Sequence, residues 1–198
     1  MHHYFAVHKP YGYLSQFKNN QRRKKPLLQE LHDFPEGIMA VGRLDAKSEG
    51  LLLLTTNGKW SHYLRSKKFE KEYYVELGGV PSEESIEKLR KGVNISIEGK
   101  TYATLPAKVS CILKPSLKFI EDRQVRKKQH GPTSWLNITI KEGKFRQVRK
   151  MTAAVGHPTL RLIRMRFAEF QLDPLIEGQV RPLSQSELNK IEGFACQS

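Results

Sequence analysis

The chain contains several short stretches in which apolar residues alternate with polar ones or follow one another without a break. The first pattern predicts a strand with one exposed face, and the second predicts a buried strand. Residues 51–56 begin with four leucines and stop at Asn57-Gly58, whereas residues 71–77 alternate and stop at Gly78-Gly79. We expect further strands at residues 4–8, 93–97, 108–112, 135–141 and 159–165.

Helical signals are fewer and lie between these stretches. Ser82 precedes two glutamates and an apolar-periodic segment that ends at Gly92, which predicts a helix over residues 83–91 with Ser82 as its N-cap. Residues 60–65 and 145–155 also have helical patterns, the second ended by Gly156, and residues 27–31 predict a short helical turn.

Strands outnumber helices in this pattern, and the two do not alternate strictly. The sequence therefore predicts an α+β fold with a mixed, mainly antiparallel central sheet flanked by helices. The polar segments 18–26 and 114–132 are expected to be exposed connections. A length of 198 residues suits one or two small domains.

Charge changes the picture more than composition does. The chain has 34 Lys and Arg against 20 Asp and Glu, a net charge of +14, and a pI of about 9.8. Residues 121–166 alone hold twelve basic and three acidic residues. Such a concentration predicts a polyanionic partner, with nucleic acid favoured over a membrane surface because no strongly amphipathic helix is evident.

Several classes of protein are disfavoured by what the sequence lacks. It has no apolar stretch long enough to span a bilayer and no secretory signal, so we expect a cytoplasmic protein with reduced cysteines. It also lacks phosphate-binding glycine loops, spaced metal ligands and a serine hydrolase elbow. Any chemistry is therefore expected to rest on an acid among bases, without a metal.

Asp45 is the candidate for that acid. It follows Gly42-Arg43-Leu44 and precedes the leucine-rich strand, so it should lie on a loop at a strand end, where active-site side chains are common. The local pattern taken alone favours a turn or capping Asp that pairs with Arg43.

A family resemblance favours the first interpretation. Residues 42–58 closely resemble the catalytic signature of RNA pseudouridine synthases, in the form found in the bacterial RsuA family. Residues 8–12, 71–75, 142–151 and 159–164 resemble further motifs of that family in the same order. The departures are Lys144, Phe145 and Lys150, of which the two lysines keep the basic charge but not the bidentate geometry of arginine.

The resemblance implies a pseudouridine synthase fold with a basic cleft. It is strongest for the large-subunit branch E, whose members lack an S4 RNA-binding domain. We accordingly expect residues 1–198 to form a single catalytic domain, with two subdomains flanking the cleft and no S4 domain. The implied activity is the isomerisation of a uridine to pseudouridine in large-subunit (23S) ribosomal RNA by a monomer that uses no cofactor.

The resemblance also implies roles for individual residues. Asp45 would be the essential carboxylate, which either attacks C1′ or takes the 2′ proton; Arg149 would pair with it, and Tyr73 would stack on the base and suit removal of the C5 proton. Val148 would pack on the uracil, and Arg43 would fill the space left by a flipped nucleotide or hold a phosphate. The other expected RNA contacts are Lys144, Arg146, Gln147, Lys150, Arg126, Lys127 and Lys128.

A helical wheel of residues 146–155 is consistent with such contacts. Val148, Met151 and Val155 fall on one side, and three cations, Arg146, Arg149 and Lys150, fall on the other. Two alternatives to the enzyme remain at this point. A catalytically silent RNA-binding ribosome-assembly factor would have the same charge but no need of Asp45, and a DNA-binding regulator would need a helix-turn-helix, which the sequence does not contain.

Overall fold

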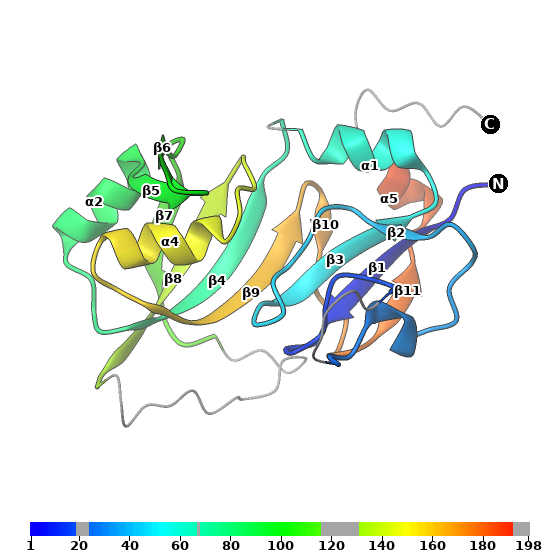
Figure 1. Ribbon diagram of the computed structural model, residues 1–198, viewed down its shortest axis with the longest axis horizontal. Coiled ribbons are helices and arrows are strands. Elements are labelled where there is room, and N and C mark those ends of the chain that lie inside the picture. The colour runs from blue at the N-terminus through cyan, green and yellow to red at the C-terminus, as the bar shows by residue number, and fades with distance from the viewer. Residues whose placement is uncertain (19–23, 67, 116–130, 192–198) are drawn as a thin grey trace.

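The computed structural model describes residues 1–18, 24–66, 68–115 and 131–191 (Figure 1). One large sheet dominates, with its strands in the order β11-β1-β3-β9-β4-β8-β7. These strands are β1 (Tyr4–Lys9), β3 (Glu49–Thr55), β4 (Lys71–Gly78), β7 (Lys108–Ile112), β8 (Thr133–Ile140), β9 (Thr159–Phe167) and β11 (Val180–Pro182). Two short strands, β2 (Met39–Ala40) and β10 (Phe170–Gln171), join it beside β3 and β9.

Helices cover both faces of this sheet. On one face, α2 (Glu83–Lys91) and α4 (Gln147–Ala154) contribute to the same apolar core as Leu52 and Leu54. On the other face, α1 (Gly58–Leu64) and α5 (Gln185–Asn189) pack on Leu51, Leu53 and their neighbours. Successive leucines of β3 thus face opposite cores, which explains why all seven residues of this strand are buried. In Figure 1 the first pair of helices lies on the left and the second on the right.

The centre of the sheet contains a parallel strand pair. β3 runs parallel to β9, whereas the other described ladders of this sheet are antiparallel. Gly50 lies at this junction with a φ of 103°, and a Cβ built on it would be 2.4 Å from the carbonyl oxygen of Arg164. Only glycine permits so close an approach of the two backbones. The expected mixed, mainly antiparallel sheet flanked by helices is confirmed.

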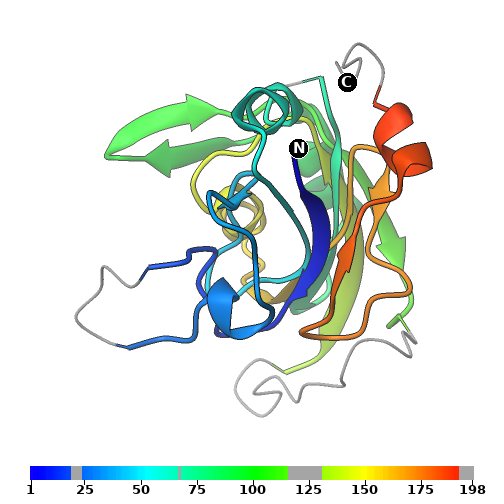
Figure 2. The same ribbon diagram turned by 90° about the vertical axis from the view of Figure 1, so that its right-hand side faces the viewer.

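Most elements follow the sequence signals. Ser82 caps α2 by accepting a hydrogen bond from the Ser85 amide, and Asn57 caps α1 by accepting one from the Trp60 amide. The helical turn expected at residues 27–31 is a short 3-10 helix, η1 (Leu28–Glu30). Strand β5 (Asn94–Ile97) pairs with an unexpected β6 (Lys100–Ala103) in a separate hairpin, which projects from the body of the molecule in Figure 2.

The helix expected over residues 145–155 is shorter than predicted. It begins at Gln147, because Arg146 has a left-handed backbone with a φ of 53° and is the N-cap. Residues 143–146 therefore form a loop that directs Lys144, Phe145 and Arg146 outward, and all three are exposed. Most of the connection expected at residues 114–132, including Arg126, Lys127 and Lys128, lies outside the described residues. None of the helices in the described ranges is both long and apolar enough to cross a membrane.

Candidate active site

A cavity of about 180 Å³ opens where β4 and β9 meet the loop before β3 and the start of α4. Of the described residues that line it, Asp45 is the one acid. The basic residues that line it are Arg43, Arg65, Lys71, Lys144, Arg146 and Arg164. The cavity is thus strongly cationic around a single carboxylate, as the charge pattern predicts for a site that takes an anionic polymer.

The loop that carries Asp45 is fixed by hydrogen bonds on both sides of that residue. The Ser15 hydroxyl donates to the Leu44 carbonyl and accepts from the Leu44 amide, at 2.8 and 3.0 Å. The Gly12 amide donates to the carbonyl of Ala46 at 2.7 Å. The Asp45 backbone is therefore held from the β1 side, which orients its side chain without using the carboxylate.

Arg149 lies opposite this carboxylate. Its Nε is 3.9 Å from Asp45 Oδ2, and the side chains are 10% and 25% exposed respectively. The distance makes this an ion pair without a direct hydrogen bond, and Nε is buried without a hydrogen-bond partner in the described part of the chain. At this distance Arg149 does not engage the carboxylate oxygens of Asp45 in a hydrogen bond, so they can act on a substrate.

The guanidinium of Arg149 is fixed by other groups. Nη1 donates to the Thr159 carbonyl at 3.2 Å, and Nη2 donates to the Lys47 carbonyl at 2.6 Å and lies 3.4 Å from the Ser48 hydroxyl. Burial lowers the pKa of Arg149, and the nearby charge of Arg146 acts in the same direction, whereas Asp45 raises it. Arg149 thereby ties α4 to β9 and to the loop of Asp45.

The remaining walls of the cavity are apolar or aromatic. Tyr73 is 7% exposed and comes from β4, while Val148 from α4 and Leu162 from β9 are also buried. Together they offer an apolar slot next to the carboxylate, in a cavity whose volume suits one nucleobase better than a large ligand. The structure thus brings Asp45, Tyr73, Arg149 and Val148 together, Arg149 through its pair with Asp45 and the others in the cavity wall.

The expected RNA-contact residues are placed less uniformly. Arg43, Lys144 and Arg146 are exposed and line the cavity. Gln147 also lines it, but its amide is buried and bonds to Glu142 and to the Lys144 backbone, so it mainly shapes the loop. Lys150 does not line the cavity: its Nζ donates to the Ser96 carbonyl and lies 5.1 Å from the Phe145 ring centroid. The wheel argument is confirmed for the apolar side, where Val148 and Met151 are buried. It is wrong in grouping the three cations on the opposite side of one helix, because Arg146 is the N-cap and Arg149 is largely buried.

The lining residues that sequence reasoning did not assign to the site include Arg65, Lys71, Arg164 and Phe167. Strand alternation could have found Lys71, because it is two residues from Tyr73 and so faces the same side. Nothing local marks Arg65, Arg164 or Phe167, since their place depends on how distant strands pair. Within the described ranges, no three His, Cys, Asp or Glu side chains are grouped so that they could hold a metal ion.

Comparison with known protein families gives a match to the model described as RNA pseudouridylate synthase, over residues 3–154. The chain belongs to this family. The match contains Asp45, Tyr73 and Arg149, the three residues that the sequence motifs single out.

Similar proteins agree with this assignment. The chain is 43% identical over 175 residues to ribosomal large subunit pseudouridine synthase E of Vibrio parahaemolyticus, covering 86% of this chain and 69% of that protein. It is 41% identical over 171 residues to the protein of the same name from Xanthomonas axonopodis, covering 85% and 87%. Ribosomal small subunit pseudouridine synthase A of Escherichia coli is more distant, at 32% identity over 194 residues, covering 95% and 73%.

Solved structures give the same fold. A crystal structure of a pseudouridylate synthase has a TM-score of 0.75 and 32% sequence identity, covering 96% of this chain and 74% of that one. An archaeal box H/ACA complex of Nop10 and Cbf5 has a TM-score of 0.54 at 16% identity, covering 89% and 51%, which is a likeness of fold alone. The expected pseudouridine synthase fold is confirmed, and the chain is a pseudouridine synthase of this family.

Proposed function

We propose that this synthase converts a specific uridine of large-subunit (23S) ribosomal RNA to pseudouridine, with Asp45 as its essential carboxylate. The observation that carries the proposal is the ion pair of Asp45 with Arg149 beside a cationic cavity that has no second acid among its described lining residues. The names of the relatives with 43% and 41% identity support large-subunit RNA over small-subunit RNA as the substrate.

The reaction is an isomerisation in which no group is lost from the RNA. The N1–C1′ bond breaks with its electrons passing to uracil, the base turns, and C5 bonds to C1′ while C5 loses a proton and N1 gains one. Asp45 would assist either by forming an ester with C1′ or by taking the 2′ proton and later returning it. Both routes need an ionised carboxylate, and Arg149 places a positive charge 3.9 Å from it.

The base would occupy the slot between Tyr73 and Val148. Its C1′ and N1 are not accessible within a stacked helix, so the nucleotide must be flipped into the cavity. The side chain of Tyr73 lies in the cavity wall, on the same strand face as Lys71. From this position Tyr73 would stack on the uracil ring, and its hydroxyl would be placed to accept the C5 proton. Arg43, exposed at the rim, would occupy the space that the base leaves or hold a phosphate.

The RNA backbone would be bound by charge around the cavity. Lys144 and Arg146 line its rim, and Arg126, Lys127 and Lys128 are basic residues outside the described ranges that we assign to the same task. Such binding is salt-dependent. We also propose that the chain acts as a single catalytic domain and as a monomer in the cytoplasm, where bacterial ribosomal RNA is made, and that it needs no cofactor for an isomerisation.

The test is a pseudouridine map of ribosomal RNA from cells that carry the wild-type chain, Asp45→Asn, or no copy of the gene. We expect one large-subunit site to be modified in the wild type and unmodified in the other two. Asp33→Asn is the matched control, because Asp33 is an exposed carboxylate that does not line the cavity. A map without any wild-type-dependent site, together with intact RNA binding, would instead favour the silent assembly factor.

A further inference from the structure

Strand β9 contains one residue more than β4 across the floor of the cavity. Glu72 is opposite Arg166, but the next residue of β4, Tyr73, is opposite Arg164, so Met165 has no partner. A β-bulge of this kind changes which face of the sheet the following side chains take. Its position beside the cavity therefore decides where two neighbouring arginines of β9 point.

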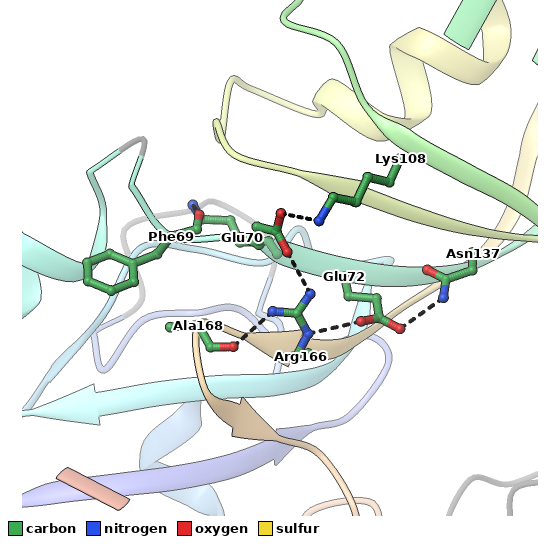
Figure 3. Close-up of polar contacts among 8 residues, drawn as sticks. Phe69, Glu70, Glu72, Lys108, Asn137, Arg166 and Ala168 are labelled. Atoms are coloured by element: carbon green, nitrogen blue, oxygen red, sulfur yellow. Dashed lines mark hydrogen bonds and ion pairs between the residues drawn. The ribbon is translucent and has the colours of Figure 1, made fainter. Parts of the chain in front are cut away.

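The two arginines have opposite surroundings. Arg166 is held by acids: Nε donates to Glu72 and Nη2 to Glu70, each at 3.0 Å (Figure 3). Arg164 lies on the cavity side, where Nε donates to the Leu51 carbonyl at 2.7 Å. Its Nη2 is buried and has no hydrogen-bond partner in the described residues.

Alternation along β4 also places Lys71 on the cavity side of the sheet, away from the acids next to it in the sequence. Glu70 and Glu72 are used on the other face, where Glu70 also pairs with Lys108 and Glu72 also accepts from Asn137, as Figure 3 shows. Lys71 faces the cavity with Tyr73, and its Nζ donates only to the Phe69 carbonyl among the described residues, at 3.1 Å. The two acids that flank Lys71 in the sequence are thus directed away from it.

The result is a pair of buried cations without a carboxylate. Lys71 is 6% and Arg164 3% exposed, and both lie over the ring of Phe167, with 5.0 and 5.1 Å to its centroid. Burial and the charge of Arg164 lower the pKa of Lys71 to about 8. Leaving two like charges buried and unpaired costs folding free energy, which is typical of a site that keeps its charges for a ligand.

We propose that Lys71 and Arg164 contact the flipped uracil and stabilise the negative charge that it acquires when the N1–C1′ bond breaks. This inference rests on the proposed function. The electrons of the broken bond pass to N1 and are delocalised over the two carbonyl oxygens of the ring, which ammonium and guanidinium groups can bind. When C5 bonds to C1′ and loses its proton, N1 is protonated and the charge is gone, so the stabilisation acts mainly in the transition state and the intermediate.

A backbone phosphate is the other anion that RNA carries. The deep burial of Lys71 and Arg164 favours contact with the base over contact with a phosphate. Asp45, whose side chain is 25% exposed, must reach C1′, whereas Lys71 and Arg164 are far more buried. The group that lies beyond C1′ toward the floor of the cavity is the uracil. Phosphates are outside C1′ and meet the exposed cations of the rim.

The decisive variant is Lys71→Met, which removes the charge and keeps the length of the side chain. We expect single-turnover conversion of a uridine-containing RNA fragment to be about 100-fold slower, with RNA affinity changed less than about 2-fold. We also expect the variant to be more stable toward urea than the wild type, because it no longer buries an unpaired charge. A purely structural lysine would give the opposite change in stability.

The charge on uracil is tested with the same RNA fragment carrying 5-fluorouridine at the target position. Fluorine at C5 makes the uracil anion less basic and a better leaving group. Cleavage of the N1–C1′ bond should therefore depend less on stabilisation by Lys71 and Arg164. Loss of 5-fluorouridine from digested RNA should then be slowed by Lys71→Met severalfold less than uridine conversion is. Arg164→Lys keeps the charge but loses Nη2. It should likewise slow the loss of 5-fluorouridine severalfold less than it slows the conversion of uridine.

Matched controls are Lys108→Met and Arg166→Lys, which change the same residue types on the other face of the sheet. They should affect both substrates equally and lower stability. The inference would be overturned by equal rate losses with uridine and 5-fluorouridine, by an effect on RNA affinity alone, or by unfolding of Lys71→Met. Failure of the proposed function is a separate outcome, since the wild type itself would then form no pseudouridine in large-subunit RNA.

Discussion

Arg149 Nε lies 3.9 Å from Asp45 Oδ2, while the same guanidinium donates to the carbonyl of Lys47, two residues further along the Asp45 loop. The guanidinium of Arg149 therefore orients the loop by binding the loop's backbone, and it also places a positive charge beside the Asp45 carboxylate. These two tasks can be separated by substitution. The carboxylate itself holds little of the structure together, because its loop is fixed by Ser15 and Gly12.

Asp45→Asn should lower turnover by about 10³-fold or more, since an amide can neither attack C1′ nor take a proton. Its free energy of unfolding should stay within about 1 kcal/mol of the wild type, because the lost ion pair is long and partly exposed. Pseudouridine formation and urea unfolding on the same preparation check this. Turnover near the wild-type rate would contradict the assignment of Asp45.

Arg149→Lys keeps a positive charge near Asp45 but cannot reach the carbonyls of Thr159 and Lys47 together. We expect a loss of about 1–3 kcal/mol in unfolding free energy, because the carbonyls of Thr159 and Lys47 lose a charged donor, and a lower turnover as well. Arg181→Lys is a matched control, since Arg181 pairs with Glu187 far from the cavity. It should lower stability without slowing a single turnover.

Gly50→Ala should prevent folding or cost more than about 3 kcal/mol. Its Cβ would be 2.4 Å from the Arg164 carbonyl oxygen and 2.6 Å from the Arg164 nitrogen, both of which are backbone atoms that cannot move aside, and its φ of 103° is unfavourable for alanine. Gly58→Ala, at the first residue of α1 with no atom within 4 Å of its Cβ, is the control. Gly58→Ala should leave the stability unchanged or raise it slightly. Thermal unfolding of the two variants and the wild type measures the difference.

Glu49 and Arg161 form a buried ion pair between β3 and β9, with 2.8 Å between Oε1 and Nε and side chains 0% and 6% exposed. Glu49→Gln should cost about 3–5 kcal/mol, because it removes the carboxylate that pairs directly with a buried guanidinium. Adding Arg161→Met should recover part of this loss. Urea unfolding of the single and double variants would contradict the interpretation if the two losses simply added.

Much of the framework could be predicted from the sequence because it depends on local signals. The Ser82 cap, the stop at Gly92 and the leucine run of β3 each act within a few residues, and the structure contains each of them. The pairing of Asp45 with Arg149 came from the family resemblance and not from local pattern. Its geometry depends on α4 packing against a loop that is distant in the sequence.

The features that escaped prediction depend on long-range pairing. β6, β10 and β11 are two to four residues long and exist because a neighbouring strand pairs with them. The bulge at Met165 has no sequence signal of its own, yet it separates the surroundings of Arg164 and Arg166. The left-handed backbone of Arg146 likewise shortens α4 against a helical pattern, because residues 143–146 form the exposed cavity rim.

Lys127→Gln with Lys128→Gln should weaken RNA binding and reduce its salt dependence. Each lysine that neutralises a phosphate contributes roughly 0.7–0.9 to the slope of log affinity against log salt, so the double variant should have a slope shallower by about 1.5. Lys88→Gln with Lys91→Gln removes equal charge from α2, away from the cavity. Filter binding at several salt concentrations compares the two double variants. An equal change in slope for both would contradict the role of Lys127 and Lys128 in binding the RNA backbone.

The difference in stability between Lys71→Met and the wild type should depend on pH in one direction. The pKa of Lys71 is about 8 in the folded chain, well below the ordinary 10.5 that applies when the chain unfolds. Below pH 8 both states carry the proton, and the folded wild type bears the full cost of a buried charge. Between pH 8 and 10.5 the folded state releases the proton while the unfolded state keeps it, so the wild type becomes more stable as pH rises.

The methionine variant lacks this gain, so its advantage should be largest below pH 8 and shrink steadily above it. Other titrating groups, such as Lys9 with its pKa of about 7, are present in both proteins and largely cancel in the difference. Urea unfolding of the two proteins in parallel, from pH 6.5 to 10, measures it. A difference that stays constant or grows with pH would mean that Lys71 is not held as a buried cation, and the electrostatic role proposed for it would fall with that result.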